Sequence, residues 1–429
     1  MFEFNFGYNG TERLGKGDRF EFFPAVSLGW LVSNEKVFEP LSDVVSSLKL
    51  RGSYGLVGSD ETGPSGAPHF LYIDQVQVTG NGRPGFTTGE NLNVSYYGPV
   101  VQQWAVQNGG WERVKKLDVG FDMELFRELS ITFDFFYDKR YNILLHREAW
   151  PQSLGFHGAK PWSNKGKVDN WGYEVSTNWR KQLTKDLTVD FRGTFTYTQN
   201  KYIDLDEPIY PYVWQTATGK PLNRRTGYIA EGLFQSQEEI DNSPTQNLGS
   251  KPMPGDIKYR DVDGNGLIDS KDQVMISKTA GMPRIQYGFG VNIDWKRFNF
   301  GVFFNGSAMR DIDINGLHPF GQNDYNAMKF VAENRWTEAN PNPNAEYPRL
   351  GLNDSQMSNN SQSSTYWIRN GNFLRFKTLE IGYRFDHVRL YFTGNNLAVF
   401  SPFKLWDPEL GWNSYPLQRT FCIGAQLSF

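Results

Sequence analysis

The sequence consists largely of ribbons in which apolar and polar side chains alternate residue by residue. KKLDVGFDMELF is the clearest: Leu117, Val119 and Phe121 share one parity, while Asp118 and Asp122 lie on the other. Successive side chains of a strand point to opposite faces, so each ribbon predicts a β-strand with one apolar and one polar face. The pattern recurs about a dozen times along the chain. No run reaches the roughly 18 apolar residues that a membrane-spanning helix needs.

The lengths of the ribbons and of their connections narrow the fold class further. Several ribbons run to ten residues or more, which matches the roughly 9–11 residues that a tilted strand needs to cross a bilayer. Tight turns near Arg127, Lys181, Lys296 and Asp386 alternate with long segments. These long segments are residues 58–110, 140–167, 200–283, 309–365 and 397–417. Tight turns at one end and long loops at the other are typical of outer-membrane β-barrels.

We therefore predict an all-β, transmembrane antiparallel β-barrel with about 12 strands in this chain. A closed sheet leaves no backbone group unpaired in hydrocarbon, so the apolar parity would face lipid and the polar parity a wet interior. The apolar parity switches near Thr378, which predicts a β-bulge at that point. The terminal strand ends on Phe429, and Cys422 falls on its interior parity.

Composition and motifs exclude several other classes. A net charge of −3 gives no basic surface for nucleic acid. The single cysteine, Cys422, rules out an internal disulfide framework. The histidines show no zinc spacing and no G-x-S-x-G nucleophile motif is present, so we expect no enzyme and no catalytic residues.

Stretches spread along the whole chain also resemble a known family. They include LKLRGSYGLVG, WERVKKLDVGFDMELF, GDIKYRDVDGNGLIDSKD, YWIRNGNFLRFKTLEIGYRF and LYFTGNNLAVFSPFKLWDPELG. In their order and spacing they resemble the C-terminal portion of the SusC/RagA-type TonB-dependent outer-membrane transporters of Bacteroidota.

The resemblance implies a plugged barrel of roughly 22 strands in the cell outer membrane. Such a barrel imports oligosaccharides or peptides with energy from the TonB complex, and a SusD-like surface lipoprotein covers it as a lid. Residues 1–429 would be the C-terminal barrel portion, without a plug domain, a signal peptide or a TonB-contacting segment. The sequence does not decide whether the chain is a gene fragment or a complete short barrel. It also does not identify the transported nutrient or the partner lipoprotein.

The segment DVDGNGLIDSKD has the spacing of a calcium loop. Oxygen ligands would come from Asp261, Asp263, Asn265, the Leu267 carbonyl, Asp269 and Asp272. Gly266 would supply the sharp turn, whereas Asp in place of Glu at the last position shortens the reach of that ligand. The alternative is a metal-free Asx/Gly turn in an extracellular loop. No other cofactor is expected.

Tryptophans in the long segments are the candidate substrate-binding residues, because flat rings with a polar edge stack well on sugars or pack on peptides. Loop packing or contact with the lid lipoprotein is the alternative for each of them. The candidates are Trp104, Trp111, Trp150, Trp162, Trp214 and Trp336.

Two other functions also fit the pattern. A passive porin-like channel would need neither plug nor energy, and a lumen lined by both charge signs would suit it. A secreted calcium-dependent carbohydrate-binding β protein would be soluble without detergent, whereas a barrel would need lipid.

Overall fold

The computed structural model describes residues 1–61, 70–78, 84–106, 109–151, 160–246, 248–315, 327–351, 354–411 and 414–427. The chain divides into two compact units. Unit 1 comprises residues 1–174, 198–210 and 217–220, and unit 2 comprises residues 175–197, 211–216 and 221–429. The terminal residue Phe429 lies outside the described ranges.

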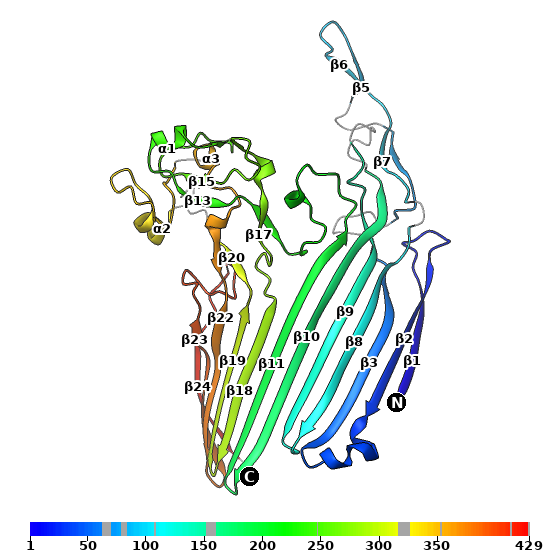
Figure 1. The fold of residues 1–429 in the computed structure, drawn as a ribbon, viewed down its shortest axis with the longest axis vertical. Helices are drawn as coiled ribbons and strands as arrows, with labels where there is room; N and C mark the ends of the chain where they lie inside the picture. Colours follow the sequence, from blue (N-terminus) through cyan, green and yellow to red (C-terminus); the bar gives the residue numbers. More distant parts are fainter. Residues whose placement is uncertain are drawn as a thin grey trace. The chain divides into compact units, whose positions relative to one another are not determined.

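The fold is all-β and is dominated by one 12-stranded antiparallel sheet (Figure 1). Its strands follow one another in chain order, because the alternating ribbons pair with their neighbours in sequence. They are β1 (Phe2–Gly10), β2 (Phe20–Leu31), β3 (Val45–Ser59), β8 (Glu112–Leu125), β9 (Leu129–His146), β10 (Trp162–Thr184), β11 (Leu187–Asp204), β18 (Ile285–Trp295), β19 (Phe298–Ala308), β22 (Phe373–Arg384), β23 (Val388–Phe400) and β24 (Thr420–Leu427).

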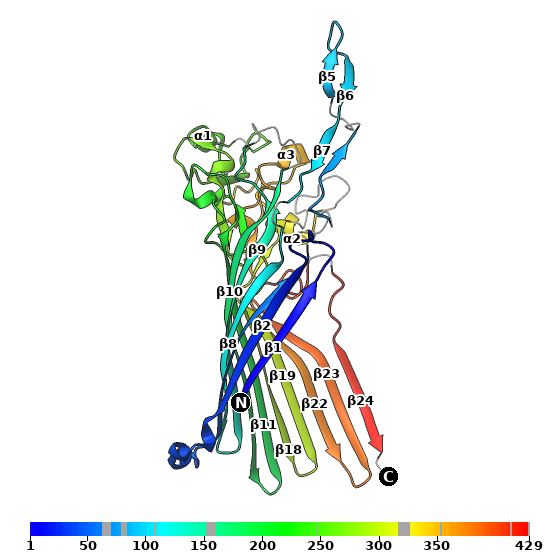
Figure 2. The same cartoon turned by 90° about the vertical axis from the view of Figure 1, so that its right-hand side faces the viewer.

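Tight turns and long connections alternate as predicted. In unit 2 the links between β18 and β19 and between β22 and β23 are tight and lie at the same end of these strands (Figure 2). Lys296 lies in the turn between β18 and β19 and has a positive φ of 52°. Its backbone N–H donates to the carbonyl of Asp186 at 2.7 Å. In unit 1, β9 extends to His146 and β10 begins at Trp162, so the second long segment is shorter than the predicted 140–167.

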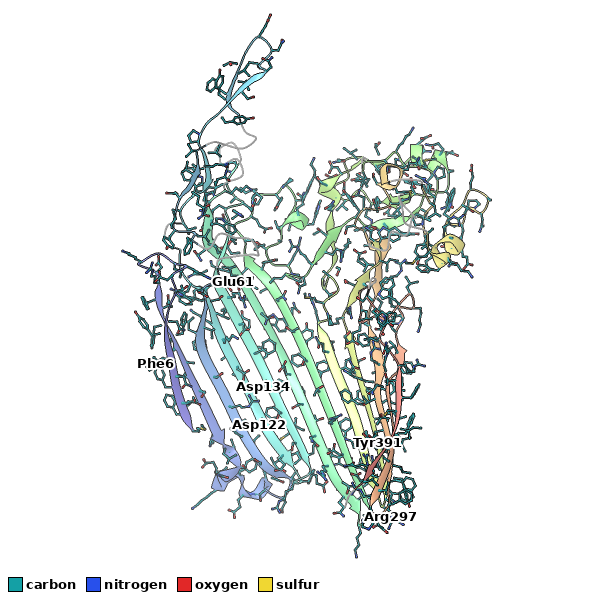
Figure 3. The ribbon with its side chains drawn as sticks, turned by 180° about the vertical axis from the view of Figure 1, so that it is seen from behind. Phe6, Glu61, Asp122, Asp134, Arg297 and Tyr391 are labelled. Atoms are coloured by element: carbon teal, nitrogen blue, oxygen red, sulfur yellow. The ribbon has the colours of Figure 1, made fainter. Side chains whose placement is uncertain are left out.

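The two faces of the strands differ in chemistry as the alternation predicts. Phe4 and Phe6 of β1 are exposed on the apolar parity (Figure 3). On the polar parity of unit 1, the Arg51 guanidinium lies 3.3 Å from Asp122 of β8 and 2.5 Å from Asp134 of the neighbouring strand β9 (Figure 3). Cys422 pairs with Thr393 on the polar parity of unit 2.

The predicted β-bulge is confirmed in β22. The register with β19 shifts between Phe303 and Phe304, and the register with β23 shifts between Phe376 and Thr378. Lys377 is thus the extra residue, and it keeps Phe376 and Leu379 on one face although their sequence separation is odd. No helix in the described part of the chain is long and apolar enough to cross a membrane.

The long segments carry short elements of their own. In unit 1 these are β4 (Gln75–Gln77), β5 (Pro84–Thr88), β6 (Val94–Tyr97) and β7 (Val100–Gln103). In unit 2 they are β12 (Arg225–Gly227), β13 (Ala230–Leu233), α1 (Gln237–Asp241), β14 (Thr245–Gln246), β15 (Ile257–Tyr259), β16 (Leu267–Ile268), β17 (Val274–Ser277), β20 (Asp311–Asp313), α2 (Lys329–Asn334), α3 (Asp354–Met357) and β21 (Ile368–Asn370).

The unit 2 segments pack around one hydrophobic cluster, which we call the loop core. Its members come from three separate long segments and include Tyr259, Tyr347, Trp367 and Phe403. Tyr259 and Trp367 are almost completely buried. The loops of unit 2 therefore form a folded module with its own hydrophobic core.

Candidate functional site

The acidic loop, residues 261–272, lies in the loop module between β15 and β17. Short β16 within it pairs in parallel with β14, which fixes the loop against the module. Asp261, Asp263 and Asp272 each place a carboxylate oxygen within 4.8 Å of the other two. Three hard oxygen donors at this spacing are suited to a calcium ion.

Asp261 organises the turn at the start of the acidic loop. Its two carboxylate oxygens accept from the N–H groups of Gly264 and Gly266, both at 2.7 Å. Both glycines have positive φ, near 73° and 83°, a region that glycine adopts without strain. Burial works to raise the pKa of Asp261, but the hydrogen bonds from Gly266 and Gly264 outweigh it and lower that pKa below its ordinary value.

Asp272 closes the acidic loop from its other end. Its side chain is fully buried and accepts from the N–H groups of Val262 at 2.7 Å and Asp269 at 2.9 Å. Asp269 instead accepts from the N–H of Lys271 and caps the short 3₁₀ turn Ser270–Asp272. Asn265 accepts from the N–H of Leu267. The structure therefore gathers three of the predicted ligands and gives Asp269 and Asn265 backbone partners.

A pair of aromatic residues packs against the acidic loop. The sequence pattern did not connect this pair with the loop. The rings of Tyr212 and Trp214 stack with centroids 4.5 Å apart. The Trp214 indole N–H donates to the carbonyl of Lys271 at 2.8 Å. A hydrogen bond to Asp263 raises the pKa of the Tyr212 hydroxyl. About fifty residues separate the pair from the loop, so no local spacing could have joined them.

The six candidate tryptophans lie in different environments. Trp336 is buried in the loop core, where its indole N–H donates to Gln235 at 3.3 Å. Trp111 is buried against Leu14 and Phe23 in unit 1. Burial of these two rings favours the packing interpretation. Trp104 is 40% exposed, and Trp150, Trp162 and Trp214 are half-buried.

A cavity of about 610 Å³ lies in the loop module beside α1. It is lined by residues from α1 and from the segments 243–246 and 249–252, among them Gln237, Ile240 and Lys251. Its size falls within the range of small-ligand sites. None of the six tryptophans lines it, and its mixture of polar and apolar side chains has no sequence pattern that would have predicted it.

Comparison with known proteins places the fold. No protein-family model matches the chain. TonB-dependent receptor P26 of Formosa agariphila is 27% identical over an alignment that covers 98% of this chain and 44% of the receptor. The TonB-dependent receptor SusC of Bacteroides thetaiotaomicron is 26% identical, with 100% of this chain and 42% of SusC covered.

Solved structures agree with the sequence comparison. The RagAB peptide transporter matches with a TM-score of 0.69 and 22% identity, covering 100% of this chain and 46% of that one. The RagAB peptide importer in its "open-open" state gives a TM-score of 0.71 at 20% identity and covers 45% of that chain. The present chain thus spans less than half the length of the relatives it matches.

In fold and sequence the chain is similar to the C-terminal β-barrel part of TonB-dependent receptors. Within that class, the predicted resemblance to the SusC/RagA type is confirmed by the similarity to SusC and by the fold shared with RagAB. The named relatives are receptors and transporters.

Proposed function

We propose that this chain is part of a TonB-dependent outer-membrane importer of oligosaccharides or peptides. It works with a SusD-like surface lipoprotein and draws its energy from the TonB complex. The observation that carries the proposal is the similarity to TonB-dependent receptors over essentially the whole chain. The alternating exposed apolar parity of the strands supports a position in lipid.

Uptake in the producing bacterium tests the proposal. Cells lacking the gene should fail to take up one labelled class, oligosaccharide or peptide, and cells lacking TonB should fail in the same way. A SusD-like lipoprotein should co-purify with the product of the complete gene from outer membranes. Uptake that survives loss of TonB would instead identify a passive channel. Recovery of the protein in the soluble secreted fraction would favour the calcium-dependent carbohydrate-binding alternative.

The acidic loop supports a second proposed property, the binding of Ca²⁺ for loop stiffness. The supporting observation is the convergence of Asp261, Asp263 and Asp272 carboxylates within 4.8 Å. Three carboxylates at this distance repel one another, and a divalent cation would relieve that repulsion. We assign the ion this structural part and no catalytic one.

Terbium luminescence provides the measurement, since Tyr212 and Trp214 lie beside the loop and can sensitise a bound lanthanide. We expect a signal that Ca²⁺ displaces, and weakening by about tenfold or more in Asp263→Asn. Asp269→Asn is the matched control and should keep the signal, because Asp269 serves the 3₁₀ turn. Absence of any signal in the native protein would leave the metal-free Asx turn as the correct interpretation.

A further inference from the structure

Residues 401–411, which we call the strap, leave the end of β23 and enter the loop module of unit 2. Phe403 is 5% exposed and belongs to the loop core. Leu405 and Trp406 pack against the same cluster, and the Phe403 and Trp406 rings meet edge to face at 4.5 Å. One side of the strap is therefore anchored by hydrophobic burial.

The other side of the strap is held by a buried charge. Arg375 of β22 is 2% exposed and lies on the polar parity of its strand. Its guanidinium donates to Asp407 at 2.6 Å and to Glu409 at 3.1 Å. It also donates to the side-chain oxygen of Asn396 on β23. One guanidinium thus joins two neighbouring strands to two carboxylates of the strap.

A second arginine completes the electrostatics of this cluster. Burial lowers the pKa of the Arg310 guanidinium, just beyond β19, against the opposing charges of Glu409, Asp311 and Asp407. Its Nε is buried without an acceptor within the described ranges. The two guanidinium groups therefore lie among the carboxylates of Asp407, Glu409 and Asp311. Removing one partner of a buried ion pair leaves an uncompensated charge, which is strongly destabilising.

Uncharged contacts fix both ends of the strap region. The Ser401 hydroxyl donates to the carbonyl of Asn372 at 2.7 Å. Asn396, held at a φ of 54°, donates through its amide to the carbonyls of Leu417 and Gln418 at 3.1 and 3.3 Å. The strap is therefore tied down before, at and after the segment that carries Asp407 and Glu409.

We propose that Arg375 is a positioning residue that clamps the strap, and through Phe403 and Trp406 the loop core, onto the loop end of β22 and β23. Hydrophobic burial holds the strap to the module, whereas the ion pairs hold it to the sheet. Loss of the ion pairs should free the strap while the strands stay paired. The clamp is independent of which nutrient the protein carries, so its test does not depend on the outcome of the uptake experiment.

The single cysteine of the chain allows a site-specific test. A spin label at Lys404→Cys, in a background where Cys422 and any cysteine outside these 429 residues are replaced by serine, reports on an exposed strap residue in outer membranes that contain the product of the complete gene. We expect greater label mobility in Arg375→Gln and an intermediate increase in Arg375→Lys, which keeps the charge but not the forked geometry. Arg389→Gln is the matched control, because Arg389 pairs with Glu380 on the same strands away from the strap.

A second variant keeps the test decisive if Arg375→Gln does not assemble. Asp407→Asn removes one charge and leaves the Arg375–Glu409 pair, so the barrel should form and the label should still become more mobile. Combining Asp407→Asn with Arg375→Gln should add little further mobility, because both act on one interaction. Unchanged label mobility in assembled Arg375→Gln or Asp407→Asn would overturn the proposal. An increase in label mobility in Arg389→Gln as large as that in Arg375→Gln would also overturn it.

Discussion

At the residue scale, identical side chains in the acidic loop perform different tasks. Asp261 accepts from two glycine N–H groups at the surface, whereas Asp272 is buried and holds the opposite end of the loop. Asp269 caps a short turn. The spacing of these residues within twelve positions predicted that they share a loop. Which backbone N–H group each carboxylate accepts from depends on how the loop folds. Sequence alone could not separate the converging carboxylates from the capping one.

The lowered pKa of Asp261 predicts how the acidic loop responds to acid. A carboxyl whose folded-state pKa is lowered stabilises the fold above its unfolded value, about 3.9, and loses that contribution as pH falls through the folded-state value. We expect the hydrogen-exchange protection of the Gly266 amide to stay constant down to about pH 4 and to fall only in stronger acid. A decline that already begins near pH 6 would contradict the lowered pKa.

Asp261→Asn probes the same contacts at neutral pH. The amide has one acceptor oxygen where the carboxylate has two, so either the Gly264 or the Gly266 N–H loses its partner. A loss of about 1 kcal/mol corresponds to roughly fivefold faster exchange at the affected glycine. Asp241→Asn on α1 is the control and should leave both amides unchanged. Equal protection in the two variants would mean that these bonds contribute nothing to loop order.

At the scale of elements, the strands were predictable and the loop module was not. Period-2 alternation located the strands, and even the bulge at Lys377 follows from the parity switch near Thr378. The loop core has no such signal, because Tyr259, Tyr347 and Trp367 come from distant segments without periodicity. Burial of Trp336 likewise depends on tertiary packing that its local sequence does not encode. Local sequence patterns therefore predict the strands of the sheet, whereas the loop module depends on packing between residues far apart in the sequence.

Deletion of Lys377 tests the structural role of the bulge. Without the extra residue, Leu374 and Phe376 would exchange faces with Arg375, because a one-residue shift reverses every side chain beyond it. We expect failure of outer-membrane assembly, measured as loss of the protein from the membrane fraction and of its heat-modifiable band. Lys377→Ala keeps the residue count and should assemble normally. Normal assembly of the deletion variant would show that the register can adjust elsewhere.

At the scale of the whole molecule, the order of the sheet follows the order of the chain. Strands joined by a tight turn become neighbours, as β18 and β19 do, and so do strands joined by a long segment, as β19 and β22 do. The alternation of turn lengths predicted the fold class, and the strand order is what an antiparallel sheet built from successive strands has. Within the described ranges, the sheet ends at β1 on one side and at β24 on the other.

These two terminal strands predict the behaviour of the 429-residue chain when it is produced alone. Unpaired strand edges template association with other copies. We therefore expect aggregation in detergent and no monodisperse species by size-exclusion chromatography with light scattering. Lysines at the edges, Phe4→Lys with Ile423→Lys, should reduce aggregation, because charged edges resist pairing. Phe289→Lys on β18 is the matched control away from the edges and should give no relief. A detergent-stable, heat-modifiable monomer of the unaltered chain would show that β1 and β24 close on each other.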